Sequence, residues 1–66
     1  MKNSVQIQRK SKGITQAQLA ERVGVSRQSI VAIESGKYVP STLLALKIAR
    51  ELESEVSALF ELEPGD

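Results

Sequence analysis

Two adjacent side chains, Arg27 and Gln28, directly follow Ser26 near the middle of the chain. Serine is a favoured N-cap, so both residues are expected in the first turn of a helix. Each can form two parallel hydrogen bonds to a planar edge, arginine to guanine and glutamine to adenine. Helices that read DNA carry such side chains near their N-terminus. Taken alone, the two residues fit an ordinary polar helix surface equally well.

The composition removes most catalytic and metal-binding chemistry. The 66 residues include no cysteine and no histidine, which excludes disulfides, zinc fingers, thiol nucleophiles and histidine bases. No other nucleophile–base pair is visible, so we expect neither an enzyme nor a cofactor. Glu61, Glu63 and Asp66 are interpreted as a solvated acidic run and not as a metal site.

Charge is distributed unevenly along the chain. Residues 1–50 carry nine basic and two acidic side chains, a net charge of +7, whereas residues 51–66 carry six acidic side chains and no basic one. This pattern predicts a body that binds a polyanion and an acidic end that faces away from it. The alternative is an accidental clustering of solvated charges.

The chain shows no sign of membrane insertion or secretion. It has no apolar run of 18 residues and no signal-peptide core after its first residues. We therefore expect a cytoplasmic protein, and its length predicts a single domain over residues 1–66.

Turn and capping signals divide the chain into five short helices. Thr15 and Gln18 fit a capping box, and Gly24 is expected to end the helix that they begin. A third helix starts after Ser26, and Ser54 is expected to cap the fifth. The expected helices cover residues 4–11, 16–23, 27–35, 42–52 and 55–60, with an acidic tail over residues 61–66. The fold class is therefore all-α, and strands are not expected because no stretch alternates with a period of two.

The second and third helices have the pattern of a helix-turn-helix motif. Ala20 is small where the helices approach closely, and Gly24 permits the backbone angle of a sharp turn. Five apolar residues supply the inward face: Leu19, Val23, Val25, Ile30 and Ile33.

Three blocks of sequence resemble the Cro/phage-repressor family of helix-turn-helix regulators, also called the Xre family. They are GITQAQLA at residues 13–20, VGVSRQSI at residues 23–30 and IESGKYVPS at residues 33–41. The resemblance spans residues 5–60. It implies a lambda-repressor-like domain that binds double-stranded DNA and acts as a homodimer.

The resemblance also implies roles for single residues. Four positions match residues that contact bases: Arg27, Gln28, Ala32 and Gln16. Ala32 has no hydrogen-bonding group and can at most touch a thymine methyl. Phosphate contacts are expected from Ser26, Ser29, Lys37, Tyr38 and Lys10. Lys10 can instead be simply solubilising, and Tyr38 can instead cover the edge of the core.

Arg9 and Glu34 match a buried ion pair of the family. Independently, an acid near a helix C-terminus is disfavoured by the helix dipole, so a nearby cation would explain Glu34. The alternative is a solvated Glu34 beside Lys37. Gln8 stands where the family has a large apolar residue, and Ile7 is expected to compensate for it.

The fifth helix is too short to bury all its apolar residues on one neighbour. We therefore expect Leu59, Phe60 and Leu62 to form a two-fold interface. Such a dimer would hold two recognition helices about 34 Å apart, one turn of DNA, with the acidic tail away from the DNA.

These features together predict a dimeric repressor that reads a palindromic operator and blocks a promoter by occupying it. No pocket for a small-molecule effector is expected. Two alternatives remain: the DNA-binding domain of a larger regulator, and a protein-interaction module such as an antitoxin.

Overall fold

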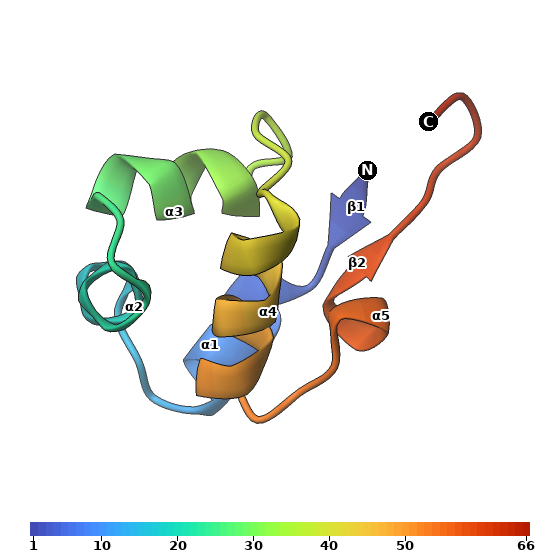
Figure 1. The fold of residues 1–66 in the computed structure, drawn as a ribbon. Helices are drawn as coiled ribbons and strands as arrows, with labels where there is room; N and C mark the ends of the chain where they lie inside the picture. Colours follow the sequence, from blue (N-terminus) through green and yellow to red (C-terminus); the bar gives the residue numbers. More distant parts are fainter.

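The computed structural model describes residues 1–66 and contains five helices and one short β-ribbon (Figure 1). The elements are β1 (Lys2–Asn3), α1 (Val5–Ser11), α2 (Gln16–Val23), α3 (Arg27–Glu34), α4 (Thr42–Glu51), α5 (Val56–Leu59) and β2 (Phe60–Glu61). The five predicted helices are confirmed, with the largest boundary differences in α5. Every helix is too short or too polar to cross a membrane.

The helix starts follow from hydrogen bonds that serine and threonine make to the first turn. The Thr15 hydroxyl accepts from the Gln18 backbone amide at 3.0 Å, and the Gln18 side chain accepts from the Thr15 amide at 2.9 Å, which confirms the capping box. Ser26 and Ser41 accept from the third residue of α3 and α4 in the same way. These caps fix where α2, α3 and α4 begin.

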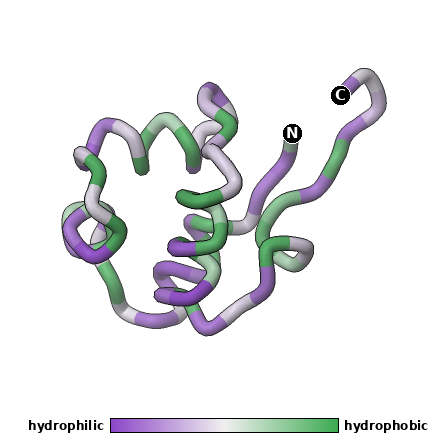
Figure 2. Tube along the Cα trace, in the orientation of Figure 1, coloured by the Kyte–Doolittle hydropathy of each residue, from purple (hydrophilic) through white to green (hydrophobic).

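The core is aliphatic and is shared by all five helices. Hydrophobic and hydrophilic residues alternate along the helices (Figure 2), as amphipathic elements require. The largest fully buried side chains are Val5, Leu19, Ile30, Ile33, Ile48, Leu52 and Leu59. Neither aromatic residue belongs to the buried set: Tyr38 is 46% exposed and Phe60 packs at the edge of the core.

The expectation of no strands is wrong. β1 and β2 pair antiparallel, with Lys2 opposite Glu61 and Asn3 opposite Phe60. Strands of two residues are too short to show any alternation, so sequence periodicity cannot detect them. The pairing continues one residue further, because the Ser4 amide donates to the Leu59 carbonyl at 2.9 Å.

The acidic tail is not detached from the body. The α-ammonium of Met1 lies 3.3 Å from the Glu63 carboxylate and 3.2 Å from that of Asp66. Glu63 also lines a small polar hollow with Ser35 and Gly36, at the C-terminal end of α3. The tail is therefore held against the amino-terminus, beside the C-terminal end of α3.

Ser54 does not cap α5. Glu53 adopts a left-handed conformation (φ 52°), and the Ser54 amide donates to the Ala49 carbonyl at 2.8 Å. Ser54 thus helps to close α4, and α5 begins at Val56 after Glu55 without a side-chain cap. The predicted start of the fifth helix is wrong for this reason.

Ile7 does not compensate for the polar residue at position 8. Ile7 is 72% exposed. The Gln8 side chain instead donates to the Ser4 hydroxyl at 2.9 Å and to the Ala58 carbonyl at 3.5 Å. Hydrogen bonds to the residue before α1 and to α5 thus stand where an apolar contact of α1 was expected.

Candidate nucleic-acid interface

α2 and α3 pack against each other around a turn at Gly24. Leu19, Ala20 and Val23 from α2 are buried, as are Ile30 and Ile33 from α3. Gly24 has a φ of 77°, and an added Cβ would meet no atom within 4 Å. Glycine is therefore favoured here by backbone conformation and not by crowding. The result is a helix-turn-helix with a rigid packed side and a free outer side.

The free side of α3 carries the expected base-contacting residues. Arg27, Gln28 and Val31 are exposed, and Ala32 is half-buried. Arg27 and Gln28 are the first two residues of α3, so their side chains extend from its N-terminal end. This face can present two bidentate hydrogen-bonding groups to a groove of DNA.

Hydroxyl and basic groups flank the two ends of α3. The Ser26 and Ser29 hydroxyls lie 3.1 Å apart at the N-terminal end. At the other end, the amides of Lys37 and Tyr38 both donate to the Ala32 carbonyl, at 2.9 and 3.2 Å. This turn brings Lys37 and Tyr38 to the end of the recognition helix.

Lys10, the last residue expected to contact phosphate, and its neighbour Lys12 belong to the C-terminal end of α1 and not to α3. Lys10 is exposed in the last turn of α1, and no hydrogen bond joins it to α2 or α3. Lys12 is engaged elsewhere, because its ammonium lies 2.9 Å from the Glu53 carboxylate. That hydrogen bond and the lysine charge lower the pKa of the Glu53 carboxyl.

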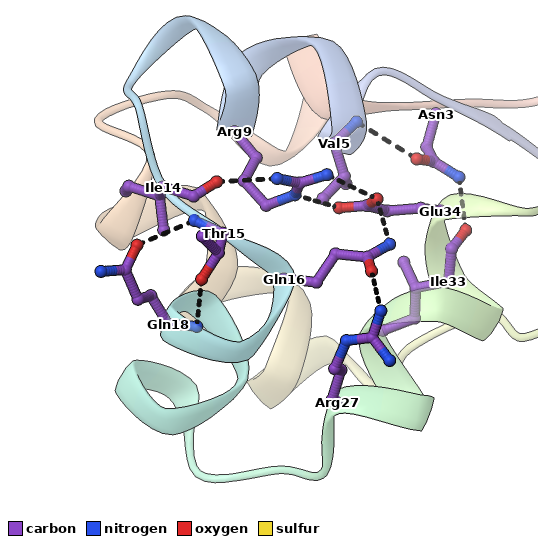
Figure 3. A network of polar contacts seen from close by, with 10 residues as sticks. All are labelled: Asn3, Val5, Arg9, Ile14, Thr15, Gln16, Gln18, Arg27, Ile33 and Glu34. Carbon is purple, nitrogen blue, oxygen red and sulfur yellow. Dashed lines mark hydrogen bonds and ion pairs between the residues drawn. The ribbon is translucent and has the colours of Figure 1, made fainter.

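Arg9 and Glu34 form a buried ion pair. Arg9 Nε donates to Glu34 Oε2 at 2.7 Å and Nη2 donates to Oε1 at 3.2 Å (Figure 3). Only 7% of the Arg9 side chain and 4% of the Glu34 side chain are exposed. A third bond, from Arg9 Nη1 to the Ile14 carbonyl at 2.7 Å, ties the pair to the segment before α2. The alternative of a solvated Glu34 is therefore wrong.

The ion pair continues towards the free side of α3 through Gln16. Gln16 Nε2 donates to Glu34 Oε1 at 3.0 Å, and Arg27 Nη2 donates to Gln16 Oε1 at 3.2 Å (Figure 3). The sequence pointed to Gln16 and Arg27 as separate DNA contacts and missed their bond to each other. The available signal was that each is the first residue of one of two packed helices.

Asn3 is a second contact that sequence reasoning missed. Its side-chain amide donates to the Ile33 carbonyl at 2.8 Å, and its side-chain oxygen accepts from the Val5 amide at 3.2 Å. Asn3 thus joins β1 to the C-terminal end of α3. An asparagine two residues before a helix is a recognisable turn former, but nothing in the sequence identifies its distant partner.

An open apolar groove of about 860 Å³ runs between α4, α5 and β2. Its lining includes Leu46, Arg50, Glu55, Phe60 and Leu62. Leu46 is 54% exposed and Leu62 is 77% exposed, whereas Phe60 is half-buried.

Leu59 does not belong to this surface. It is 1% exposed and forms part of the core. Its assignment to an interface is therefore corrected.

Comparison with known proteins gives a consistent result. The helix-turn-helix family model matches residues 5–59. An uncharacterized HTH-type transcriptional regulator of Methanothermobacter thermautotrophicus is 53% identical over 64 residues, covering 96% of this chain and 93% of the relative. The Bacillus subtilis HTH-type transcriptional regulator YgzD is 49% identical over 63 residues, covering 96% of both chains.

Two solved structures share the fold. The restriction-modification controller protein C.AhdI of Aeromonas hydrophila superposes with a TM-score of 0.78 at 32% identity, over 85% of both chains. The clp gene regulator ClgR of Corynebacterium glutamicum gives the same TM-score at 28% identity, over 82% of this chain and 57% of ClgR. These matches confirm the family resemblance seen in the sequence. They are matches to DNA-binding regulators and not to enzymes. The chain belongs to the Xre-like helix-turn-helix family of DNA-binding transcriptional regulators.

Proposed function

We propose that this regulator is a homodimeric repressor that reads a palindromic operator through α3. The observation that carries the proposal is the exposure of Arg27 and Gln28 in the first turn of a helix whose other side is buried. A helix with exposed groups at its N-terminal end that can form bidentate hydrogen bonds suits direct readout in the major groove.

Each of the four proposed base-contacting residues has its own proposed partner. Arg27 pairs with guanine and Gln28 with adenine, as their hydrogen-bonding groups require. Ala32 contacts a thymine methyl, and Gln16 contacts the first bases or the adjoining backbone.

Phosphate contacts supply most of the affinity, so binding weakens steeply as salt rises. The residues proposed for them are Ser26, Ser29, Lys37, Tyr38 and Lys10. Their hydroxyl and ammonium groups donate to phosphate oxygens and fix the register of α3 on the duplex. Repression then follows because the bound protein occupies the promoter. A protein that acts in this way works in the cytoplasm, where its DNA lies.

A second copy of the chain is the proposed occupant of the groove between α4 and α5. The groove is apolar, with Leu46 and Leu62 exposed, and it also contains Arg50 and Glu55. A two-fold interface places the same surface on both subunits. Arg50 of each copy can then face Glu55 of the other, so the groove is self-complementary in charge as well as in polarity.

The position of the groove suits a reader of two half-sites. In Figure 1, α2 and α3 lie on one side of α4, and α5 and the ribbon lie on the other. Two copies joined at the groove therefore carry their recognition helices on the outside. The longest dimension of the chain is 32 Å, which is compatible with half-sites about 34 Å apart.

Selection from a random pool of duplex DNA tests the operator. We expect a palindrome whose half-sites are about one helical turn apart, recovered at both low and moderate salt. Unrelated sequences whose binding disappears at moderate salt would reject sequence-specific reading and favour a protein-interaction module.

Sedimentation of a matched pair of variants tests the dimer. Leu46→Asp places a charge in the groove, and Leu43→Asp places one on the same helix outside it, at a residue that is 64% exposed. We expect the first to give monomers and the second to leave the dimer intact. Equal effects, or a wild-type chain that is monomeric at micromolar concentration, would reject this interface.

A charge exchange tests the orientation of the two copies. Arg50→Glu and Glu55→Arg are each expected to weaken the dimer, because like charges then face each other. The double variant is expected to restore it. Failure of the restoration would mean that the two side chains do not face each other across the two-fold axis.

A further inference from the structure

A series of hydrogen bonds links Arg9 to Arg27 through Glu34 and Gln16. Every side chain in the series except Gln16 carries only donors or only acceptors. A guanidinium group only donates and an ionised carboxylate only accepts. Gln16 lies between Glu34 and Arg27 and carries one donor group and one acceptor. Only one orientation of its amide satisfies both neighbours, with Nε2 towards Glu34 at 3.0 Å and Oε1 towards Arg27 at 3.2 Å.

The orientation of Gln16 is thus set from the interior of the protein. Glu34 is held by two hydrogen bonds from Arg9, and both side chains are more than nine-tenths buried. Gln16 is half-buried and Arg27 is exposed. The contacts therefore run in order from the buried ion pair to the surface that faces DNA (Figure 3).

We propose that Glu34 is a positioning residue for base readout, which acts through Gln16 to hold Arg27 in the pose that reads its base. The proposal rests on the proposed function, in which Arg27 contacts guanine. One N–H group of Arg27 is used on Gln16, and the others remain free for a base edge. A side chain that is ordered before binding loses less conformational freedom on binding, so a buried residue that touches no DNA sharpens the base preference.

Glu34→Gln keeps the shape of the side chain but replaces a carboxylate, which only accepts hydrogen bonds, with an amide that both donates and accepts. When the new amide places its oxygen opposite Arg9 Nε, its NH₂ group takes the position of Oε1 and faces Gln16. The Gln16 amide must then turn round to accept, and its own NH₂ group faces the Arg27 guanidinium, donor against donor. Arg27 loses its acceptor and is released from Gln16.

The expected effect is a loss of discrimination at one base pair of each half-site. Preference for the base pair read by Arg27 falls roughly tenfold, within the roughly five- to 150-fold that a bidentate contact supplies. Preference at the base pair read by Gln28 is retained, because Gln28 has no hydrogen bond to the network.

Two further variants separate positioning from stability. Gln16→Met removes the acceptor for Arg27 while Arg9 and Glu34 remain paired, so it gives the same loss at the base pair read by Arg27 even if Glu34→Gln fails to fold. The contact proposed for Gln16 itself is lost in addition in this variant, and the order of Arg27 in the free protein reports on positioning alone. Ile48→Val lowers stability from within the core of α4, away from the network, and leaves the base preference unchanged.

The experiment has two readouts. The first is the base preference of each variant in the duplex selection. The second is the order parameter of the Arg27 Nε–H group in the free protein, measured by ¹⁵N NMR relaxation. We expect Arg27 to be ordered in the wild type and in Ile48→Val, and mobile in Glu34→Gln and Gln16→Met.

The two readouts also keep the proposals distinguishable. If the wild type selects no sequence, the proposed function fails, and the NMR result alone decides whether Glu34 orders Arg27. If the wild type selects an operator and the order and base preference of Gln16→Met and Glu34→Gln are unchanged, the positioning role is rejected.

Discussion

Arg9 and Glu34 are the two most heavily hydrogen-bonded side chains of the protein, with three hydrogen bonds each. Arg9 donates two to Glu34 and one to the Ile14 carbonyl. No buried side-chain nitrogen or oxygen in the protein lacks a partner. A buried ion pair that is fully satisfied adds little net stability, but loss of one partner is costly because the other charge stays buried.

Glu34→Ala is therefore expected to destabilise the protein strongly. The unpaired guanidinium should lower the free energy of unfolding by about 3 kcal/mol. For a domain of this size that corresponds to a drop in melting temperature of about 10 °C or more, measurable by circular dichroism. Glu21→Ala, which removes an exposed acid on α2, is the control and should change the melting temperature little. Equal melting temperatures for both variants would contradict the structural role of the pair.

Glu53 provides a test of electrostatics outside the DNA-binding surface. The hydrogen bond and charge of Lys12 lower the pKa of this carboxyl from 4.5. A lowered folded-state pKa means that the contact stabilises the protein above the unfolded-state value and that this contribution is lost as pH falls through the folded-state value. We expect a carboxyl-detected NMR titration to show a midpoint below 4.5 in the wild type. Lys12→Met should move the midpoint back up, and no movement would exclude Lys12 as the cause.

For single residues, the sequence indicated where polar side chains stand in the helices better than it predicted which residues they contact. Arg27 and Gln28 could be placed at a helix start because Ser26 is a local signal. The pairing of Arg9 with Glu34 rested on a family resemblance and on the oddity of an acid at a helix end. The bonds of Gln16 to Glu34 and of Asn3 to Ile33 join residues far apart in sequence, and no local pattern encodes them.

Among the elements, the turn between α2 and α3 allows the conformational role of a glycine to be tested separately from its small size. Gly24 has a positive φ and open space where a Cβ would stand, so substitution there tests backbone conformation without a steric clash. Gly24→Ala is expected to lower the free energy of unfolding by about 1 kcal/mol, because a non-glycine residue is strained in the left-handed region. Gly24→Asn should lose less, since asparagine tolerates that region better. Urea denaturation measures both, and an equal or larger loss for Gly24→Asn would contradict a purely conformational role of this glycine.

The elements themselves were predictable to the extent that their signals are local. Caps at Thr15, Ser26 and Ser41 set the starts of α2, α3 and α4 within a residue. The start of α5 was misplaced because Ser54 closes α4 through a contact with Ala49 that a sequence pattern does not reveal. The β-ribbon was missed because its two short strands exist only through their pairing and through contacts with other elements.

For the whole molecule, the separation of charge along the sequence is partly undone by folding. Lys12 pairs with Glu53, and the α-ammonium of Met1 pairs with Glu63 and Asp66. Acidic residues from the end of the chain thus return to the basic body. The cations that remain free, and not the net charge of the first 50 residues, determine how strongly the protein attracts DNA.

Salt dependence distinguishes free from engaged cations. Lys37→Met should reduce the slope of log K against log salt concentration by about 1 for each bound subunit, hence by about 2 for the dimer, because each subunit loses one phosphate contact. Lys12→Met should leave the slope nearly unchanged, because Lys12 is already paired with a carboxylate. Fluorescence anisotropy with labelled operator at several salt concentrations measures both. A larger change for Lys12→Met would relocate the phosphate-binding surface.

The exclusion of both aromatic rings from the core also makes the molecule its own sensor. The chain has one tyrosine, one phenylalanine and no tryptophan. Tyr38 stands at the end of α3, and Phe60 lines the groove between α4 and α5. Tyrosine emission therefore reports from the edge of the proposed DNA-binding side alone, and a fluorinated phenylalanine would report from the groove alone. Occupancy of the two surfaces can be followed independently in a single sample, with the packed interior spectroscopically silent.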